Sequence, residues 1–224
     1  MLTQSWPGMS KLAIPRPHAI LFDWDNTLVD TWPCITRATN ITRKAMGFTP
    51  WTADQVRIHV AGSLRDTFPD IYGDRWKEAR DIFYNAFSTT HIEMLAALPG
   101  AHELLEEASA ANLYLAIVSN KTGKYLRAES DHLGWTSFFG CLVGAQDAKK
   151  DKPATDPIHL ALLQAGIKAG PNVWFVGDAS IDIICGKNAH CSTVLLGPNP
   201  IDGIQPDMHI SDCAALSTLL RSCL

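Results

Sequence analysis

Short apolar runs alternate with longer segments of helical period along the chain. Six runs have the length of strands and are apolar almost throughout: 18–24, 113–119, 142–145, 173–177, 193–196 and 208–210. Strands that are buried on both faces belong to a parallel sheet covered by helices. The pattern therefore predicts an α/β fold with a doubly wound parallel sheet.

Helix signals lie between these runs. Thr122 precedes a helical segment at 123–132. Asp156 followed by Pro157 is typical of the start of another helix, with Asp156 as its cap. Gly166 stands where that helix is expected to end. Strand and helix thus alternate, as a doubly wound sheet requires.

One interval lacks this alternation. Between Thr31 and Leu98 the pattern predicts no strand. Helical segments are expected there at 32–46, at 52–60 with a Thr-x-x-Gln capping box, and at 74–95. Helices inserted directly after the first strand predict a small all-helical cap at residues 31–97. The Rossmann-like core would then consist of residues 1–30 and 98–224.

The composition excludes several classes of protein. The 224 residues are 46% hydrophobic and 19% charged, a balance that neither a disordered chain nor a fibre has. The formal net charge of -4, with no basic block, argues against a nucleic-acid partner. The apolar runs are far shorter than the ~20 residues of a membrane helix, so a membrane is not expected as a partner.

The six cysteines are scattered and form no Cys-x-x-Cys pair, so the sequence offers neither a metal knuckle nor a redox motif. Free thiols are typical of a reducing compartment. Residues 1–17 lack the uninterrupted apolar core of a secretory signal, and we expect them to form a tail. The expected location is the cytoplasm.

Polar side chains gather after the predicted strands. In open parallel sheets, ligands bind beyond the carboxyl ends of the strands. The residues at these ends are Asp23 and Asp25, Ser119 and Asn120, and Asp178 and Asp182, and Lys152 lies in the loop before the helix that begins near Pro157. We therefore expect these side chains to form one site.

Four aspartates and a single lysine carry more negative charge than a site can hold without a cation. Like charges so close together raise the pKa of one of the carboxyls. Oxygen ligands select a hard cation, and Mg²⁺, which binds through one or two carboxylates and a substrate phosphate, fits best. A carboxylate nucleophile, a second carboxyl for acid/base work and a metal form a known solution for phosphoryl transfer through an aspartyl phosphate.

These residues resemble the four motifs of the haloacid dehalogenase superfamily. The segment FDWDNTLVDT at 22–31 is similar to the first motif, Asp-x-Asp-x-Thr. LAIVSN, which ends at Ser119 and Asn120, resembles the second, a hydrophobic strand ending in Ser or Thr. Lys152-Pro153 resembles the third, and GDASID at 177–182 resembles the fourth, Gly-Asp-x-x-x-Asp. All four occur in the family's order, which makes the resemblance specific.

The resemblance implies a role for each motif residue. Asp23 would be the nucleophile, and Asp25 would protonate the leaving oxygen and then activate water. Thr27 and Ser119 would bind the phosphoryl oxygens or steady the nucleophile loop, helped by the backbone N–H of Asn120. A neighbouring lysine, Lys152, would neutralise the nucleophile.

The resemblance also implies a magnesium site. Asp178 would hold Mg²⁺ beside Asp23 and the backbone carbonyl of Asp25, and Asp182 would act at the metal or through its water.

Ordinary structural roles compete with these assignments. The first aspartate pair could close a strand turn, and the second could mark a solvated helix start. Ser119 and Asn120 could cap the following helix, and Lys152 could be a solvated surface lysine. The occurrence of all four motifs in order favours the catalytic interpretation.

Three residues test this interpretation. Asn26 stands where the family's phosphatases commonly have Gly, and Asn tolerates a positive φ. Trp24 is bulky and is expected to narrow the floor of the site. Dehalogenase-type members lack a carboxylate two residues after the nucleophile, so Asp25 favours phosphate chemistry.

Two other functions remain open. Sugar phosphomutases of the same superfamily carry a cap histidine four residues after the Asp-Thr pair, where this chain has Ile35 after Asp30-Thr31. A catalytically silent binding protein on the same fold is the other alternative, because a fold does not determine a function.

The cap is expected to select a small phosphorylated metabolite. The segment VAGSLRDTF at 60–68 resembles the cap stretch of phosphoglycolate phosphatase-like members. Arg65 could bind a substrate carboxylate or phosphate in a bidentate way, or it could be an ordinary surface residue. His59, Arg57 and His91 are weaker candidates for the same task.

Overall fold

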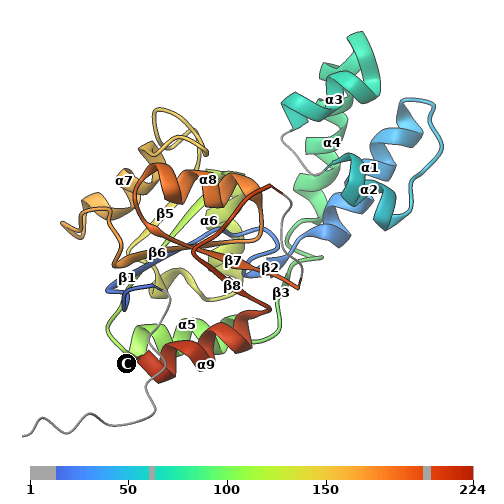
Figure 1. Cartoon of the computed structure of the whole chain (residues 1–224). Helices are drawn as coiled ribbons and strands as arrows, with labels where there is room; N and C mark the ends of the chain where they lie inside the picture. Colours follow the sequence, from blue (N-terminus) through green and yellow to red (C-terminus); the bar gives the residue numbers. More distant parts are fainter. Residues whose placement is uncertain (1–13, 61–63, 199–202, 224) are drawn as a thin grey trace, which may run out of the picture.

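The computed structural model describes residues 14–60, 64–198 and 203–223. Its centre is a six-stranded parallel sheet (Figure 1). In spatial order the strands are β5 (Cys141–Ala145), β4 (Tyr114–Thr122), β1 (Ala19–Phe22), β6 (Val173–Gly177), β7 (Ser192–Leu196) and β8 (Met208–Ile210). All six predicted strands are confirmed, and the chain has the α/β fold that the pattern of apolar runs predicts.

Helices cover both faces of this sheet. On one face lie α5 (Ala101–Ala110), α6 (Gly123–His132) and α9 (Cys213–Cys223), and on the other lie α7 (Asp156–Leu163) and α8 (Ser180–Asn188). Strand β1 supplies both cores, because Ile20 and Phe22 pack on the first side while Ala19 and Leu21 pack on the second. Its continuous apolar character is the consequence of burial on both faces.

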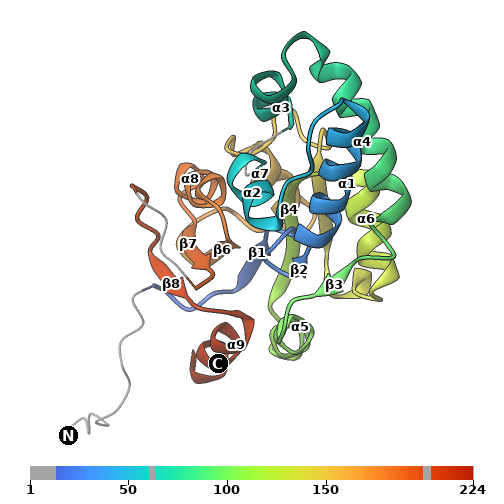
Figure 2. The ribbon, with the colours of Figure 1, turned by 90° about the vertical axis from the view of Figure 1, so that its right-hand side faces the viewer.

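A separate helical unit follows β1. It contains α1 (Trp32–Ala45), α2 (Ala53–His59), α3 (Leu64–Tyr72), the 3-10 turn η1 (Gly73–Arg75) and α4 (Trp76–Thr90). The unit has its own apolar cluster, in which Phe68, Phe83 and Phe87 are buried. Figures 1 and 2 show it beside the sheet, connected to the core through a short ribbon.

That ribbon corrects the expectation of a purely helical insertion. Strands β2 (Val29–Asp30) and β3 (Ala96–Ala97) pair antiparallel, and the Leu98 amide donates to the Leu28 carbonyl at 2.9 Å. The chain therefore enters and leaves the helical unit at one place. Two-residue strands are too short to show a period of two, which is why the sequence pattern does not contain them.

Several helix predictions also need correction. Helix α3, which contains Pro69, was not predicted, and the helix expected at 74–95 divides into η1 and the shorter α4. Asp156 is the first residue of α7 and not its cap, since Thr155 occupies that position. The capping box of α2 is confirmed: Thr52 and Gln55 exchange hydrogen bonds of 2.9 and 3.2 Å.

Part of the expected N-terminal tail is packed against the core. Ile14 is buried, and the Trp174 indole donates to the Pro15 carbonyl at 2.8 Å. Residues 1–13 lie outside the described part of the chain. Among the described residues, no helix has both the length and the apolar character of a membrane span.

Candidate active site

The loop after β1 carries the first two aspartates. The Asp23 amide donates to the Val176 carbonyl of β6 at 2.9 Å, which holds the loop against the sheet. The chain then turns back sharply at Asn26, whose φ is 59° and whose amide donates to the Val29 carbonyl at 2.7 Å. Asparagine tolerates this positive φ, which is why it can stand where the family's phosphatases commonly have glycine.

Three carboxylates and one lysine meet at this edge of the sheet. Asp23, Asp178 and Asp182 each offer an oxygen, and these oxygens lie within 4.8 Å of one another. The Lys152 ammonium donates to Asp23 Oδ1 and to Asp182 Oδ1, both at 2.7 Å. The Lys152 side chain is 2% exposed, so it is a buried ion-pair partner and not a solvated surface lysine.

The charges of this cluster are not balanced. Burial, together with Asp23 and Asp182, raises the pKa of Asp178 to about 8. Burial also raises the pKa of Asp182 to about 6, although Lys152 opposes the shift. The same two aspartates, Asp182 and Asp23, raise the pKa of Lys152 against the effect of its burial. The cluster thus has the donor set and the excess negative charge that suit a divalent cation.

The fourth motif is built around a close contact. A Cβ on Gly177 would lie 2.4 Å from the side chain of Asp182, so only glycine leaves room for that carboxylate. Asp182 Oδ2 accepts from the Ala179 amide at 3.1 Å, which fixes the start of α8. Thr27 donates from Oγ1 to Asp178 Oδ1 at 3.1 Å and thereby links the first and fourth motifs.

The second motif is a structural partner of the third. Asn120 Oδ1 accepts from the Lys152 amide at 3.0 Å, and its Nδ2 donates to the Lys152 carbonyl at 3.1 Å. Ser119 is buried, and its Oγ accepts from the Lys121 amide at 3.2 Å. The peptide bond between Lys152 and Pro153 is cis. Asn120 thus holds the backbone that presents the Lys152 ammonium to Asp23.

Asp25 lies outside the three-carboxylate cluster. Its Oδ1 accepts from the ammonium of Lys121 at 2.7 Å, and its side chain is 28% exposed. Burial raises the pKa of the Asp25 carboxyl, and the Lys121 charge opposes this shift. The two aspartates of the first motif therefore have different lysine partners.

Two charged residues near Asp25 were not identified in the sequence, Lys121 and Glu129. Lys121 directly follows the second motif, within the part of β4 that runs past its predicted end. Glu129 follows Leu126 by three residues on α6 and is fully buried. An acidic residue at an apolar position of an amphipathic helix is the signal that could have found it.

Other expectations are changed by the packing. Trp24 does not narrow the floor of the site, because its ring is buried in the core and packs edge-on against Trp135. His91 is buried and paired with Glu129, so the His91 side chain is not available to bind a substrate. His59 stacks on Trp51, and Arg57 pairs with Asp54. Arg65 lies in α3, and its side chain is outside the described part of the structure.

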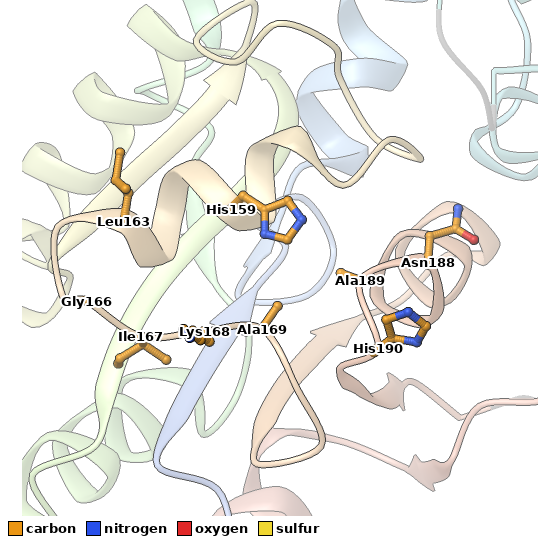
Figure 3. Close-up of a pocket in the computed structure, with 9 residues that line it drawn as sticks. All are labelled: His159, Leu163, Gly166, Ile167, Lys168, Ala169, Asn188, Ala189 and His190. Atoms are coloured by element: carbon orange, nitrogen blue, oxygen red, sulfur yellow. The ribbon is translucent and has the colours of Figure 1, made fainter.

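A separate groove lies at the opposite end of the sheet. Its volume is about 650 Å³, and it runs between the end of α7 and the end of α8, beside the loop that leads into β6. His159 and His190 stand on its two sides, as Figure 3 shows. None of the described residues that line it is a carboxylate or a predicted site residue. The groove is therefore distinct from the aspartate cluster.

The order of the sheet reverses between β1 and β6, and open α/β sheets bind their ligands at such a switch point. The aspartates after β1 and β6 lie at this point, so the fold and the site are those of an α/β protein with an acidic ligand site. Residues 20–196 match the family of haloacid dehalogenase-like hydrolases, and the chain belongs to that family. It is a hydrolase of the phosphatase type.

Two relatives illustrate the similarity. A phosphoglycolate phosphatase of Vibrio vulnificus is 29% identical over 214 residues, which cover 88% of this chain and 93% of the relative. An N-acetylmuramic acid 6-phosphate phosphatase of Pseudomonas aeruginosa is 30% identical over 183 residues, and the match covers 80% of each chain.

Two solved structures share the fold. A hydrolase of the haloacid dehalogenase-like family from Streptococcus pneumoniae superposes with a TM-score of 0.80 at 23% identity and covers 90% of this chain and 97% of its own. A structure from Thermotoga maritima described as a β-phosphoglucomutase superposes with a TM-score of 0.73 at 20% identity and covers 91% and 98% of the two chains.

Proposed function

We propose that this protein hydrolyses the phosphomonoester of a small metabolite with Mg²⁺ as its cofactor, through an aspartyl phosphate on Asp23. The observation that carries the proposal is that the two aspartates after β1 lie in different surroundings. Asp23 lies in the cluster with Lys152, whereas Asp25 is paired with Lys121 outside it. Two carboxyls in different surroundings can act as nucleophile and as acid/base.

In the first half-reaction an oxygen of Asp23 attacks the phosphorus, and the bond from phosphorus to the ester oxygen breaks. Asp25 gives its proton to the departing alkoxide, so an alcohol leaves and Asp23 carries the phosphoryl group. Lys152, 2.7 Å from Asp23, stabilises the negative charge of the group being transferred.

In the second half-reaction the ionised Asp25 takes a proton from water. The water oxygen attacks the phosphorus, the bond to Asp23 breaks, and inorganic phosphate leaves. Asp23 is then a carboxylate and Asp25 is again protonated, so the cycle is balanced in atoms and protons.

Magnesium would be held by Asp23, Asp178 and the backbone carbonyl of Asp25, with Asp182 beside them. When bound, it would neutralise charge on the phosphoryl oxygens. The donor set supports this, since three carboxylate oxygens converge within 4.8 Å and the pKa of Asp178 is raised to about 8. Both Asp182 oxygens already accept hydrogen bonds, from Lys152 and from the Ala179 amide, so we assign Asp182 mainly to holding the lysine.

The substrate would be small because the helical unit, residues 31–97, would act as a cap that excludes water and bulky esters. Relatives named for phosphoglycolate and for N-acetylmuramic acid 6-phosphate support an acidic phosphomonoester. The free thiols of the described cysteines support a cytoplasmic location.

We assign recognition of the substrate's second anion to Arg65. Changing Arg65 to Ala is expected to raise KM for phosphoglycolate about 10- to 150-fold, which corresponds to the roughly 1.5–3 kcal/mol of a hydrogen bond to a charged group. An aryl phosphate, which has no anionic group besides its phosphate, should be nearly indifferent to the change. Parallel losses on both substrates would remove Arg65 from this role.

A phosphate-release screen over small phosphomonoesters with Mg²⁺ tests the function. Asp23→Asn is nearly isosteric and should abolish turnover without unfolding the protein, whereas Asp131→Asn, an exposed aspartate on α6, should not change turnover. No phosphate release from any small ester by the native protein would favour a silent binding protein.

The phosphomutase alternative is supported by the likeness to the Thermotoga maritima structure and opposed by Ile35 at the position of the mutase histidine. A hexose phosphate that is isomerised without release of inorganic phosphate would identify a mutase.

A further inference from the structure

A buried chain of polar side chains joins the helical unit to Asp25, and the proposed reaction leaves it unused. Its members come from four segments that are far apart in the sequence. Trp24 follows β1, His91 follows α4, Lys121 lies near the end of β4 and Glu129 lies on α6.

Lys121 stands between two carboxylates. Its Nζ lies 2.7 Å from Asp25 Oδ1 and 2.8 Å from Glu129 Oε2, and its side chain is 5% exposed. The Phe87 ring of α4 covers it, with the ring centroid 5.1 Å from Nζ. The ammonium is therefore held in one position and shielded from solvent.

Glu129 is fixed in turn by three partners. Its Oε2 also accepts from the Trp24 indole at 2.7 Å, and its Oε1 lies 2.7 Å from His91 Nδ1. The Glu129 side chain is 0% exposed. Each of its oxygens is thus held in one position.

Fold stability does not account for this arrangement. An apolar residue at position 129 would suit the buried face of α6, and buried ion pairs contribute little to stability compared with apolar side chains of similar size. A network in which every member is satisfied does specify one geometry. The atom that this geometry presents to the site is the Lys121 ammonium, and it contacts one oxygen of Asp25.

We propose that Lys121 is a positioning residue for Asp25 and that Glu129 holds Lys121 in place. The inference rests on the proposed function, in which Asp25 must activate water. Lys121 binds Oδ1 of a carboxyl that is 28% exposed, so Asp25 is oriented on one side and open to the reaction on the other. His91 and Phe87 belong to the helical unit, which makes the position of that unit part of the geometry of Asp25.

The test is the pre-steady-state turnover of p-nitrophenyl phosphate by the Mg²⁺-loaded enzyme. An aryl oxide leaves with little need of a proton, so the step that depends most on an oriented Asp25 is hydrolysis of the aspartyl phosphate. Lys121→Met keeps an unbranched side chain that is one heavy atom shorter, and removes the charge. For this variant we expect a burst of p-nitrophenol that is equimolar with the enzyme. Because only the later step is slowed, kcat should fall by roughly 100-fold and KM should fall with it, so that kcat/KM stays within a few-fold of the native value.

Lys124→Met is the matched control, because Lys124 is exposed on α6, the helix that carries Glu129, and lies over Tyr125. It should behave as the native protein. Glu129→Gln should show the burst of Lys121→Met with a smaller loss of kcat. If Lys121→Met does not fold, the double change of Lys121→Met and Glu129→Gln removes both charges together, and the same burst is expected from it.

Loss of kcat and kcat/KM in parallel, without a burst, would show that Lys121 is only structural and would overturn the inference. A native kcat in Glu129→Gln would also overturn it, since Glu129 would then not hold Lys121. If the native enzyme releases phosphate from no small phosphomonoester, p-nitrophenyl phosphate included, the proposed function and this inference are overturned together.

Discussion

Asn120 holds Lys152 by both polar atoms of its backbone. The amide oxygen of the asparagine accepts from the Lys152 N–H at 3.0 Å, and its NH₂ donates to the Lys152 carbonyl at 3.1 Å. The lysine then reaches Asp23 and Asp182 with its ammonium. One side chain of the second motif thus sets the position of the third motif relative to Asp23.

Changing Asn120 to Ala should therefore lower kcat through Lys152. The change leaves two part-buried backbone groups without this partner, which costs about 1–3 kcal/mol of stability. A shift of the ammonium by about 1 Å is expected to lower kcat by roughly 100-fold. Thermal denaturation and phosphate release check both effects. Asn188→Ala, at an exposed hydrogen bond to the neighbouring Pro153 carbonyl, should leave kcat unchanged, and equal losses in both variants would contradict this account.

Gly177 should not tolerate a methyl group. Because its Cβ would lie 2.4 Å from Asp182, Gly177→Ala is expected to displace that carboxylate and the Lys152 ammonium with it. The cost of such overpacking is about 1–3 kcal/mol, with loss of most turnover. Gly170→Ala is the control, since its Cβ would have no neighbour within 4 Å. A fully active Gly177→Ala would show that the site does not depend on this contact.

Metal binding and pH should be linked. The pKa values of Asp178 and Asp182, about 8 and about 6, lie above the ordinary 3.8. The folded metal-free protein therefore keeps protons that the unfolded chain loses, and its free energy of unfolding should fall as pH rises from about 4 to about 8. Mg²⁺ is expected to bind the ionised carboxylates and therefore to raise Tm more at pH 8 than at pH 5. The same increase of Tm at both pH values would contradict the linkage.

Activity should depend on the same ion. Turnover in excess chelator is expected to cease and to return with Mg²⁺. Ca²⁺ should inhibit, because its looser and higher coordination would let the nucleophile carboxylate bind in a bidentate way, turned away from in-line attack. Full activity in chelator would remove the metal from the proposed mechanism.

Asp25 should matter most for poor leaving groups. Asp25→Asn removes the proposed proton donor, so kcat/KM for an alkyl phosphate is expected to fall by about 10²–10⁴-fold and that for an aryl phosphate by much less. Initial rates on the two esters measure the difference. Identical losses would argue that Asp25 is not the acid.

The sequence by itself predicted the parallel sheet and most of the aspartate cluster, because both depend on local chemistry. Strands that are buried on both faces are apolar throughout, so the runs at 18–24 and 173–177 predicted the parallel sheet. The carboxyl ends of parallel strands meet at one edge, so the aspartates after those runs were expected to lie together, and Asp23, Asp178 and Asp182 do. Asn26 adopts a positive φ, which the sequence allowed because asparagine tolerates it.

Only the tertiary structure decided which charges are paired. Asp25 and Lys121 are 96 positions apart, and His91 and Glu129 are 38 apart. Periodicity reports which face of an element is buried but not which element packs against it, so neither pair could be derived from the sequence pattern. The β2–β3 ribbon could not be predicted for a related reason, since Val29 and Ala97 are paired through the backbone and their side chains carry no signal of that pairing. Partners that meet only after the sheet and the helical unit pack together are properties of the folded chain.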